Sequence, residues 1–284
     1  MKVLNTKYAV ITGCSSGFGI LMAIELAKNG FHVLATMRKL DKSKILMEKA
    51  DKEGALAQIS IHELDITSSA SIENFKSLLL QLPSVDILIN NAGYAGAGFA
   101  EEIPLDEYRE QFETNVFGTI AVTQAVLPFM REQGSGTIIN ISSISGRVGF
   151  PGLSPYAASK FAVEGWSESL RLEVKPFGVN VVLIEPGSFR TGIWTTGKKI
   201  AEPSLKNDSP YYPYMTKIQK YLEQGEPFYE DPMIVAKKAV DIIREKEPAL
   251  RYPVGKGVRT RIRLKHLLTW KAWEKVIFKT LYKD

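Results

Sequence analysis

Cysteine, histidine and long apolar runs are scarce in this sequence, and each scarcity excludes a class of structure. Cys14 is the only cysteine, so the chain cannot form an internal disulfide and is compatible with a reducing compartment. Three histidines occur, His32, His62 and His266, and their wide separation gives no support to a metal site. No apolar run is long enough to cross a bilayer. Residues 1–5 lead directly into a predicted strand rather than a signal peptide, so we expect a cytoplasmic protein.

Positive charge is concentrated at one end of the chain. The formal net charge is +5, and much of the excess lies in roughly the last thirty residues. The remainder is close to neutral, so charge gives no indication of nucleic-acid binding. The length of 284 residues suits a single domain with one large core.

Short apolar runs rich in valine and isoleucine alternate with segments of helical period. The runs lie at 8–11, 32–36, 59–64, 85–90, 137–141 and 179–184, and the helical segments at 18–30, 41–54, 68–82, 105–132 and 154–176. Continuous apolar strands separated by helices indicate a parallel sheet covered on both faces. The predicted fold class is therefore α/β, a doubly wound, Rossmann-like parallel sheet.

The alternation stops between residues 188 and 230. This segment contains several prolines and many aromatic residues, and is too apolar for a linker but too irregular for the sheet. We expect it to cover a site. Asp231 and Pro232 then provide an N-cap and a first-turn proline for a helix that ends near Glu247.

A glycine-rich loop lies between the first predicted strand and the first predicted helix. Such a loop lets the backbone approach a pyrophosphate, and the helix N-terminus supplies free N–H groups. The spacing Gly13-x-x-x-Gly17-x-Gly19 differs from G-x-G-x-x-G, so a simple glycine turn is the alternative. The loop residues predicted to bind a dinucleotide are Gly13, Ser15, Ser16, Gly17, Phe18 and Gly19.

The end of the second strand indicates which nicotinamide cofactor is preferred. An NAD enzyme usually has an acidic residue there, whereas this chain has Thr36, Met37 and Arg38. Arg38 could bind a 2′-phosphate, so NADP(H) is predicted and NAD(H) is possible; a solvated charge at a strand end is the alternative. Asp65 and Ile66 could hold the adenine edge, although Asp65 could equally cap the next helix.

Tyr156 and Lys160 form a candidate catalytic pair. Their (i, i+4) spacing places both on one face of a helix, where the ammonium would favour the phenolate and lower the tyrosine pKa. Ser143 ends the preceding strand, at the sheet edge where ligands bind, and could hydrogen-bond a substrate carbonyl. A Tyr–Lys pair on a solvated helix face is the alternative interpretation.

Five motifs in a fixed order then carry a family resemblance. They are Thr12-Gly13-x-x-x-Gly17-x-Gly19, Asn90-Asn91-Ala92-Gly93, Asn115, Ser143 with Tyr156 and Lys160, and Pro186-Gly187 with Thr191. Over residues 6 to about 255 the chain resembles a short-chain dehydrogenase/reductase of the single-domain branch. The resemblance implies one dinucleotide-binding domain over residues 1–257, with 188–230 as its substrate lid.

The resemblance also implies a role for each catalytic residue. Tyr156 would exchange a proton with the substrate oxygen, while Lys160 would bind the nicotinamide ribose and lower the tyrosine pKa. Ser143 would orient the carbonyl; it is chosen over Ser142 because the family's serine precedes its tyrosine by this interval. Asn115 would hold a water that links Lys160 to solvent, unless it is an ordinary helix-face asparagine. Residues implied to contact the cofactor elsewhere are Asn91, Ala92, Gly93, Pro186, Gly187 and Thr191.

By analogy with the family, three segments should surround the nicotinamide: 93–103, 144–154 and 188–230. They are rich in large apolar side chains, namely Tyr94, Phe99, Val148, Phe150, Leu153, Trp194 and the cluster at 211–215, with Glu101 and Glu102 as the charges clearly placed in the first segment. An apolar substrate of steroid- or retinoid-like character is therefore expected; a hydrophobic lid or a subunit contact is the alternative. The resemblance also implies a homodimer or homotetramer.

Residues 258–284 lie beyond the matched region and predict a basic amphipathic helix. One stripe contains Leu267, Trp270, Trp273, Ile277 and Leu281, and a separate row contains Lys271, Lys275 and Lys279. Such a helix is typical of membrane surfaces, so a peripheral membrane contact is possible. Packing of the stripe on the domain or on a partner subunit is the other interpretation, and the one we favour.

Together these features predict an oxidoreductase that transfers hydride between NADP(H) and a carbonyl or secondary alcohol. A non-catalytic NADP(H)-binding sensor or scaffold on the same fold is the alternative, because fold does not determine function. The presence of all four catalytic residues argues against it.

Overall fold

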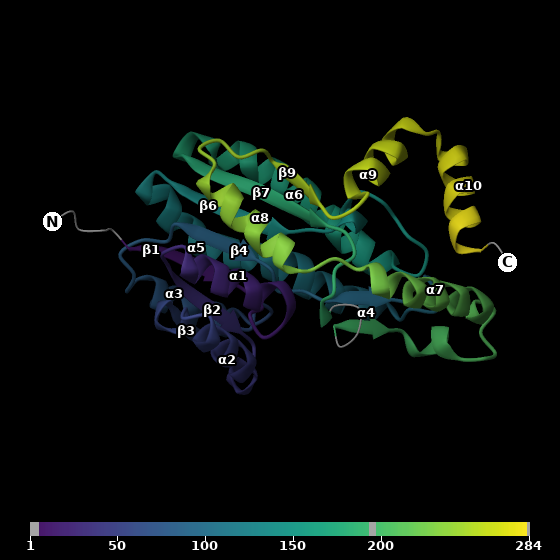
Figure 1. The fold of residues 1–284 in the computed structure, drawn as a ribbon, viewed down its shortest axis with the longest axis horizontal. Helices are drawn as coiled ribbons and strands as arrows, with labels where there is room; N and C mark the ends of the chain where they lie inside the picture. Colours follow the sequence, from purple (N-terminus) through teal and green to yellow (C-terminus); the bar gives the residue numbers. More distant parts are fainter. Residues whose placement is uncertain (1–5, 193–196, 283–284) are drawn as a thin grey trace.

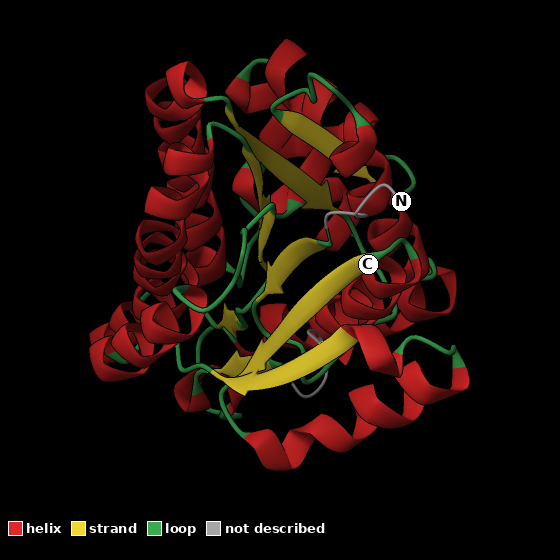
Figure 2. Ribbon diagram, turned by 90° about the vertical axis from the view of Figure 1, so that its left-hand side faces the viewer, coloured by secondary structure: helices red, strands yellow, loops and turns green. Residues whose placement is uncertain are grey.

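The computed structural model describes residues 6–192 and 197–282, which form a parallel sheet between two layers of helices (Figures 1 and 2). The strand order is β3-β2-β1-β4-β6-β7-β9, and every neighbouring pair is parallel. The strands are β1 Lys7–Ile11, β2 Phe31–Met37, β3 Ile59–Glu63, β4 Ile87–Asn90, β6 Gly136–Ile141, β7 Val179–Pro186 and β9 Arg251–Val254. The predicted doubly wound α/β class is confirmed.

The helices divide between the two faces of the sheet. Helices α1, α2 and α8 pack on one face with Ile11 and Ile89, while α3, α5 and α6 pack on the other with Val10 and Leu88. Adjacent strand residues thus point to opposite layers, which is why the strands are apolar throughout. The bounds are α1 Gly17–Lys28, α2 Lys44–Lys52, α3 Ser69–Leu79, α4 Leu105–Phe112, α5 Thr119–Gln133, α6 Ser154–Val174, α7 Tyr212–Gly225 and α8 Met233–Arg244.

The structure differs from the prediction at two elements. The segment 105–132 is not one regular helix, because a π-helix at Glu113–Gly118 separates α4 from α5. The last strand of the sheet, β9, was not predicted. It is four residues long and contains Pro253, which lacks an N–H and is tolerated because β9 lies at the edge of the sheet.

The covering segment extends from the carboxyl side of the sheet. Within its described part, β8 (Lys198–Ile200) pairs with the short strand β5 (Ala95–Ala97), and α7 follows. Gly98 also pairs with Leu153, just before α6. The segment is therefore tied to the loop after β4, and that loop is tied in turn to the start of the helix that carries Tyr156.

The C-terminal segment forms two helices rather than the single one expected. α9 spans Val258–Leu267 and α10 spans Trp270–Leu281, and the extended backbone of Leu268 and Thr269 separates them. The predicted stripe is divided accordingly: Trp273 is buried against the domain, but Leu267 and Trp270 are exposed. Figure 1 shows this pair at the same end of the molecule as α7.

Two buried carboxylates lie between α6, β7 and β9. Glu164 and Glu185 are almost fully buried, and the Arg251 Nε lies 2.8 Å from Glu164 and 3.4 Å from Glu185. Arg251 also pairs with Glu168, and Arg147 lies 3.0 Å from Glu185. Burial, followed by the neighbouring Glu164, raises the pKa of Glu185. The two arginines thus stabilise charges that the fold has removed from water.

We expect Arg251→Ala to lower the free energy of unfolding by about 3–5 kcal/mol, because it leaves two buried carboxylates with one fewer partner. Urea unfolding measures the change. Arg109→Ala is the matched control, since its pair with Asp106 is exposed on both sides and should contribute less than about 1 kcal/mol. Equal losses in the two variants would contradict the assigned role of Arg251.

Candidate active site

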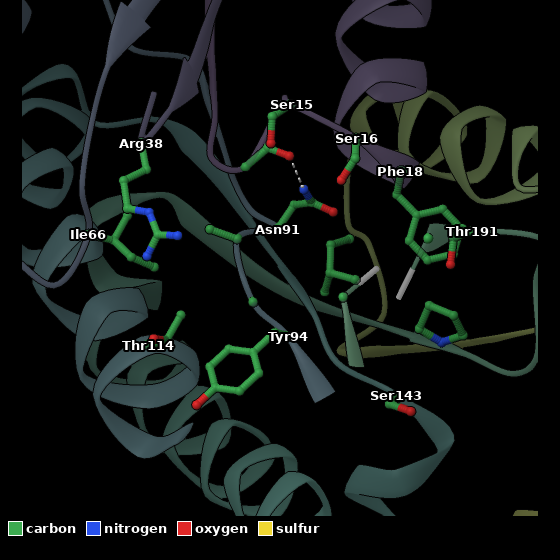
Figure 3. Close-up of a pocket in the computed structure, with 18 of the residues that line it drawn as sticks. Ser15, Ser16, Phe18, Arg38, Ile66, Asn91, Tyr94, Thr114, Ser143 and Thr191 are labelled. Atoms are coloured by element: carbon green, nitrogen blue, oxygen red, sulfur yellow. Dashed lines mark hydrogen bonds between the residues drawn. The ribbon is translucent and has the colours of Figure 1, made fainter. Parts of the chain in front are cut away.

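One cavity of about 500 Å³ opens at the carboxyl ends of the central strands (Figure 3). Its wall includes the loops after β1, β2, β3, β4, β6 and β7 and the first turns of α1 and α6. Nearly all predicted site residues line it: Gly13, Ser15, Ser16, Gly17, Phe18, Arg38, Asp65, Ile66, Asn91, Ala92, Gly93, Ser143, Tyr156, Lys160, Pro186, Gly187 and Thr191. Gly19 and Asn115 are predicted site residues that do not line it.

The glycine loop needs its glycines for two different reasons. Gly13 and Gly17 have φ angles of +73° and +55°, in the left-handed region that disfavours side chains. Gly19 has a packing role instead: a Cβ there would lie 2.4 Å from the Gly13 carbonyl oxygen. Ser16 provides no side-chain cap for α1, so the first N–H groups of this helix remain available. The loop therefore fits a pyrophosphate at a helix N-terminus.

Asn91 joins this loop to the loop after β4. Its Nδ2 donates to the carbonyl oxygens of Thr12, at 2.9 Å, and Gly13, at 3.1 Å. The Thr12 hydroxyl accepts in turn from the backbone N–H groups of Asn91 and Ala92, both at 3.0 Å. Asn91 therefore supports the loop from the cavity wall, whatever it contributes to a bound ribose.

Two cationic side chains, Arg38 and Lys42, share the wall beyond β2, and neither forms an ion pair with a described residue. Asp65 is the acidic residue on the described wall, and its Oδ1 accepts from the Thr67 N–H at 3.0 Å and hydroxyl at 2.7 Å. The sequence prediction missed Lys42, which lies one turn beyond the three strand-end positions it considered. This part of the cavity favours an anionic group.

Ser143, Tyr156 and Lys160 meet at the other end of the cavity. Ser143 follows β6, and its hydroxyl acts on the buried phenol of Tyr156, whose pKa it lowers. The Lys160 Nζ donates to the Ile141 carbonyl at 2.8 Å and lies 5.8 Å from the centre of the Tyr156 ring. Ser142 also lines the cavity, but its hydroxyl has no hydrogen-bond partner among the described residues. The geometry therefore favours Ser143 over Ser142.

Burial dominates the proton affinities of this pair. It raises the pKa of Tyr156 to about 12, against the smaller lowering effect of Ser143. It lowers the pKa of Lys160 to about 8, against the raising effect of Glu164. The expected lowering of the tyrosine pKa by Lys160 is therefore not observed, because desolvation of the phenol outweighs it. At neutral pH the protein's own groups keep the phenol protonated and the lysine charged.

Asn115 lies behind the cavity wall, in the π-helix. Its Nδ2 donates to the Tyr94 carbonyl at 3.0 Å and to the Ser159 hydroxyl at 3.2 Å, and its Oδ1 accepts from the Tyr94 N–H at 3.1 Å. Its side chain thus connects the loop after β4 with α6, next to Lys160. The water-holding role implied by the resemblance stays a prediction.

The apolar residues expected around a substrate divide into two groups. Tyr94 lines the cavity, and Phe99 stacks on Tyr211 with ring centres 4.6 Å apart. Val148 and Phe150 instead pack in the cluster that includes Trp273, so they support the C-terminal helices rather than line the cavity. Trp194 lies outside the described residues.

Glu101 and Glu102, which were expected to place charge near a substrate, hold the covering segment instead. Glu101 accepts from the Tyr211 hydroxyl at 2.6 Å, and Glu102 accepts from Ser204 at 2.7 Å and from Ser209. Because these hydroxyl groups donate to Glu101 and Glu102, the two carboxylates do not make the expected substrate-binding side of the cavity strongly acidic.

The burial of Lys160 predicts a pH-dependent stability. Its pKa of about 8 lies below the ordinary value of 10.5, so between these values the unfolded chain binds more protons and stability rises with pH. Relative to Lys160→Met, the wild-type free energy of unfolding should rise by about 2–3 kcal/mol between about pH 7 and pH 10. Urea titrations measure this, with the exposed Lys271→Met as control. Parallel curves for wild type and Lys160→Met would contradict the prediction.

The comparisons with known proteins agree with this geometry. Residues 7–200 match the family model for short chain dehydrogenases. An uncharacterized oxidoreductase of Bacillus subtilis, YusZ, is 44% identical over 280 residues, covering 98% of this chain and all of that protein. The 3-ketodihydrosphingosine reductase of Bacteroides thetaiotaomicron is 36% identical and covers 89% of both chains. The NADPH-dependent 3-dehydrocapnine reductase of Ornithobacterium rhinotracheale is 31% identical and covers 98% of both.

A solved structure extends the agreement to the whole fold. A short-chain dehydrogenase from Streptomyces avermitilis superposes with a TM-score of 0.81 at 34% identity, covering 96% of this chain and 97% of that one. The family match, the parallel sheet and the arrangement of Ser143, Tyr156 and Lys160 lead to one conclusion. The chain belongs to the short-chain dehydrogenase/reductase family.

Proposed function

We propose that this oxidoreductase uses NADPH to reduce a ketone carried on an apolar, lipid-like molecule. The observation that carries the proposal is that Ser143, the buried phenol of Tyr156 and Lys160 line the same cavity as the glycine loop. A phenol with a pKa of about 12 is a proton donor at neutral pH, which suits the reductive direction.

The residues that would hold the cofactor fit its parts. The N-terminus of α1 with Gly13 and Gly17 would take the pyrophosphate, and Lys160 would take the nicotinamide ribose. When bound, the reduced nicotinamide supplies a hydride to the substrate carbon. Tyr156 then donates its proton to the carbonyl oxygen, and Ser143 holds that oxygen within reach.

Preference for NADP(H) is supported by Arg38 and Lys42. Both lie on the cavity wall beyond β2, and a planar guanidinium binds a phosphate through two parallel hydrogen bonds. Asp65, the nearest carboxylate on this wall, is already engaged by Thr67, so its charge is partly satisfied. The relative that reduces 3-dehydrocapnine is NADPH-dependent by name, which agrees with this preference.

An apolar ketone is supported by the side of the cavity near the covering segment. Tyr94 lines the cavity, and the loop that follows it carries Phe99, which stacks on Tyr211 of the covering segment; Met215 of α7 is buried. The names of two relatives denote reductases of a 3-keto and a 3-dehydro compound, and a third, 34% identical, is human retinol dehydrogenase 8. Dihydrosphingosine and retinol are both largely hydrocarbon, which suits an aromatic wall.

Tyr156→Phe should lower kcat for NADPH-dependent ketone reduction by about 10²–10⁴-fold, because it removes the proton donor. NADPH affinity, measured by fluorescence titration, should change little. Tyr108→Phe is the matched control. The Tyr108 hydroxyl of α4 contacts Ser154, which lies on α6 like Tyr156, at 2.6 Å, but Tyr108 does not line the cavity. Undiminished turnover in Tyr156→Phe would reject the assigned role.

The same assay distinguishes an apolar from a polar substrate, and an enzyme from a non-catalytic sensor or scaffold. A long-chain 3-ketone should give a higher kcat/KM than a small polar ketone, because only the former uses the aromatic wall. A preference for small polar ketones would reject the apolar substrate. Binding of NADPH without turnover on any ketone tested would favour the sensor or scaffold.

Arg38→Ala should raise the Kd for NADPH by about tenfold to a hundredfold, because it removes a charge-assisted hydrogen-bond donor to phosphate. The Kd for NADH, which lacks the 2′-phosphate, should stay within about twofold. Arg190→Ala, on the exposed chain after β7, serves as the control. An equal loss of affinity for both cofactors would remove Arg38 from the role of selecting NADPH.

A further inference from the structure

Helices α9 and α10 have one face packed on the domain and another face left exposed. Trp273 is buried with Ile144, Val148 and Val258, and Ile277 packs against this cluster. No helix within residues 6–192 and 197–282 has the length and hydrophobicity needed to cross a bilayer. The packed face fixes the helix pair on the protein, so the exposed face is presented in a defined orientation at the edge of the molecule (Figure 1).

The exposed face of α9 is apolar with basic flanks. Leu264 and Leu267 are three residues apart, so they lie on the same side, and Leu267 is 82% exposed. On a helix with 3.6 residues per turn, the angular positions of Arg259 and Arg263 fall on one flank of these leucines. Those of Arg261 and Lys265 fall on the other flank. An apolar stripe between two basic rows is the pattern of a helix lying in a membrane interface.

Helix α10 continues this surface. Trp270, at the start of the helix, and Phe278 are more than half exposed, and Phe278 lies next to the row of Lys271, Lys275 and Lys279. The Lys265 Nζ lies 4.8 Å from the centre of the Trp270 ring, which joins the two helices at their bend. Tryptophan is enriched at membrane–water interfaces, where its amphipathic ring is favoured.

The charges of this surface are uncompensated. Glu274 is the single acidic residue in the sequence of the two helices, against seven lysines and arginines: Arg259, Arg261, Arg263, Lys265, Lys271, Lys275 and Lys279. None of the seven forms an ion pair with a described carboxylate. Such a surface would repel a second copy of itself, whereas an anionic bilayer would attract it.

We propose that the outer face of α9 and α10 binds the surface of an anionic phospholipid membrane. The basic rows contact the headgroups, while Leu264, Leu267, Trp270 and Phe278 enter the boundary between headgroups and acyl chains. The sequence left two interpretations open, packing on the domain and contact with a membrane. In this proposal both hold, because one face of the helix pair packs on the domain and the other binds lipid. This inference stands on the helix pair alone and does not depend on the proposed substrate.

Vesicle flotation of the full chain tests the proposal. Binding should be strong to phosphatidylcholine vesicles that contain about one-third phosphatidylglycerol, weak to pure phosphatidylcholine, and reduced by salt. The triple variant Lys271→Gln, Lys275→Gln, Lys279→Gln should lower the partition coefficient by about tenfold to a hundredfold. A triple variant of exposed lysines in α2, Lys44→Gln, Lys49→Gln, Lys52→Gln, has the same change in net charge and should retain most of the binding.

The apolar contribution has its own variant. Leu267→Gln with Trp270→Gln should lower binding by at least about tenfold without loss of fold, because both side chains are exposed, and Leu172→Gln on α6 is the control. Absence of binding to anionic vesicles would overturn the proposal, as would equal losses in the α10 and α2 lysine variants.

Dissociation of an oligomer by the Leu267/Trp270 variant, without vesicle binding by wild type, would assign the face to a second copy instead. NADPH-dependent reduction of a water-soluble ketone should persist in every variant, which separates this test from the proposed function.

Discussion

A buried ammonium, that of Lys160, is the charge on which the active-site arrangement depends. Desolvation opposes its charged form, and the Ile141 carbonyl and the Coulombic effect of Glu164 oppose the desolvation. Glu164 lies one turn further along α6 and is itself buried, where Arg251 of β9 binds it. A charge at the cavity is thus stabilised through a carboxylate and a guanidinium that reach the edge strand of the sheet.

The serine side of the site depends on the C-terminal helices. The residues that follow Ser143 form a short 3₁₀ turn, Ile144–Gly146, and Ile144 and Val148 pack with Trp273 and Ile262. Arg147 in this loop also contacts the His266 ring of α9 at 3.2 Å and the buried Glu185. Residues beyond the family model's match therefore support the loop that follows Ser143.

The sequence predicted most of what depends on local spacing. Strand periodicity and the glycine loop placed the sheet and one end of the cavity, because both follow from short-range steric rules. The motif order predicted a site at Ser143, Tyr156 and Lys160, and these three residues do line one cavity. What it could not predict depends on contacts between distant residues: the pairing of β9 with β7, the π-helix that positions Asn115, and the burial of Trp273 under residues 144–150. The tyrosine pKa belongs to the same class, because desolvation is set by the whole fold rather than by the neighbour four residues away.

The covering segment and the proposed lipid surface are physically joined. The end of α10 contacts α7, where the rings of Tyr214 and Tyr282 meet edge to face at 5.3 Å and the Lys217 Nζ donates to the Tyr282 carbonyl at 3.3 Å. Helix α7 in turn carries the buried Met215 and follows Tyr211, which stacks on Phe99 of the loop after β4. A membrane that binds α9 and α10 would therefore hold α7 close to the bilayer surface. An apolar ketone dissolved in that bilayer would then lie near the covering segment, which lowers the cost of exposing its hydrocarbon part to water. Membrane binding and an apolar substrate thus require the same end of the molecule, although each is supported by different residues.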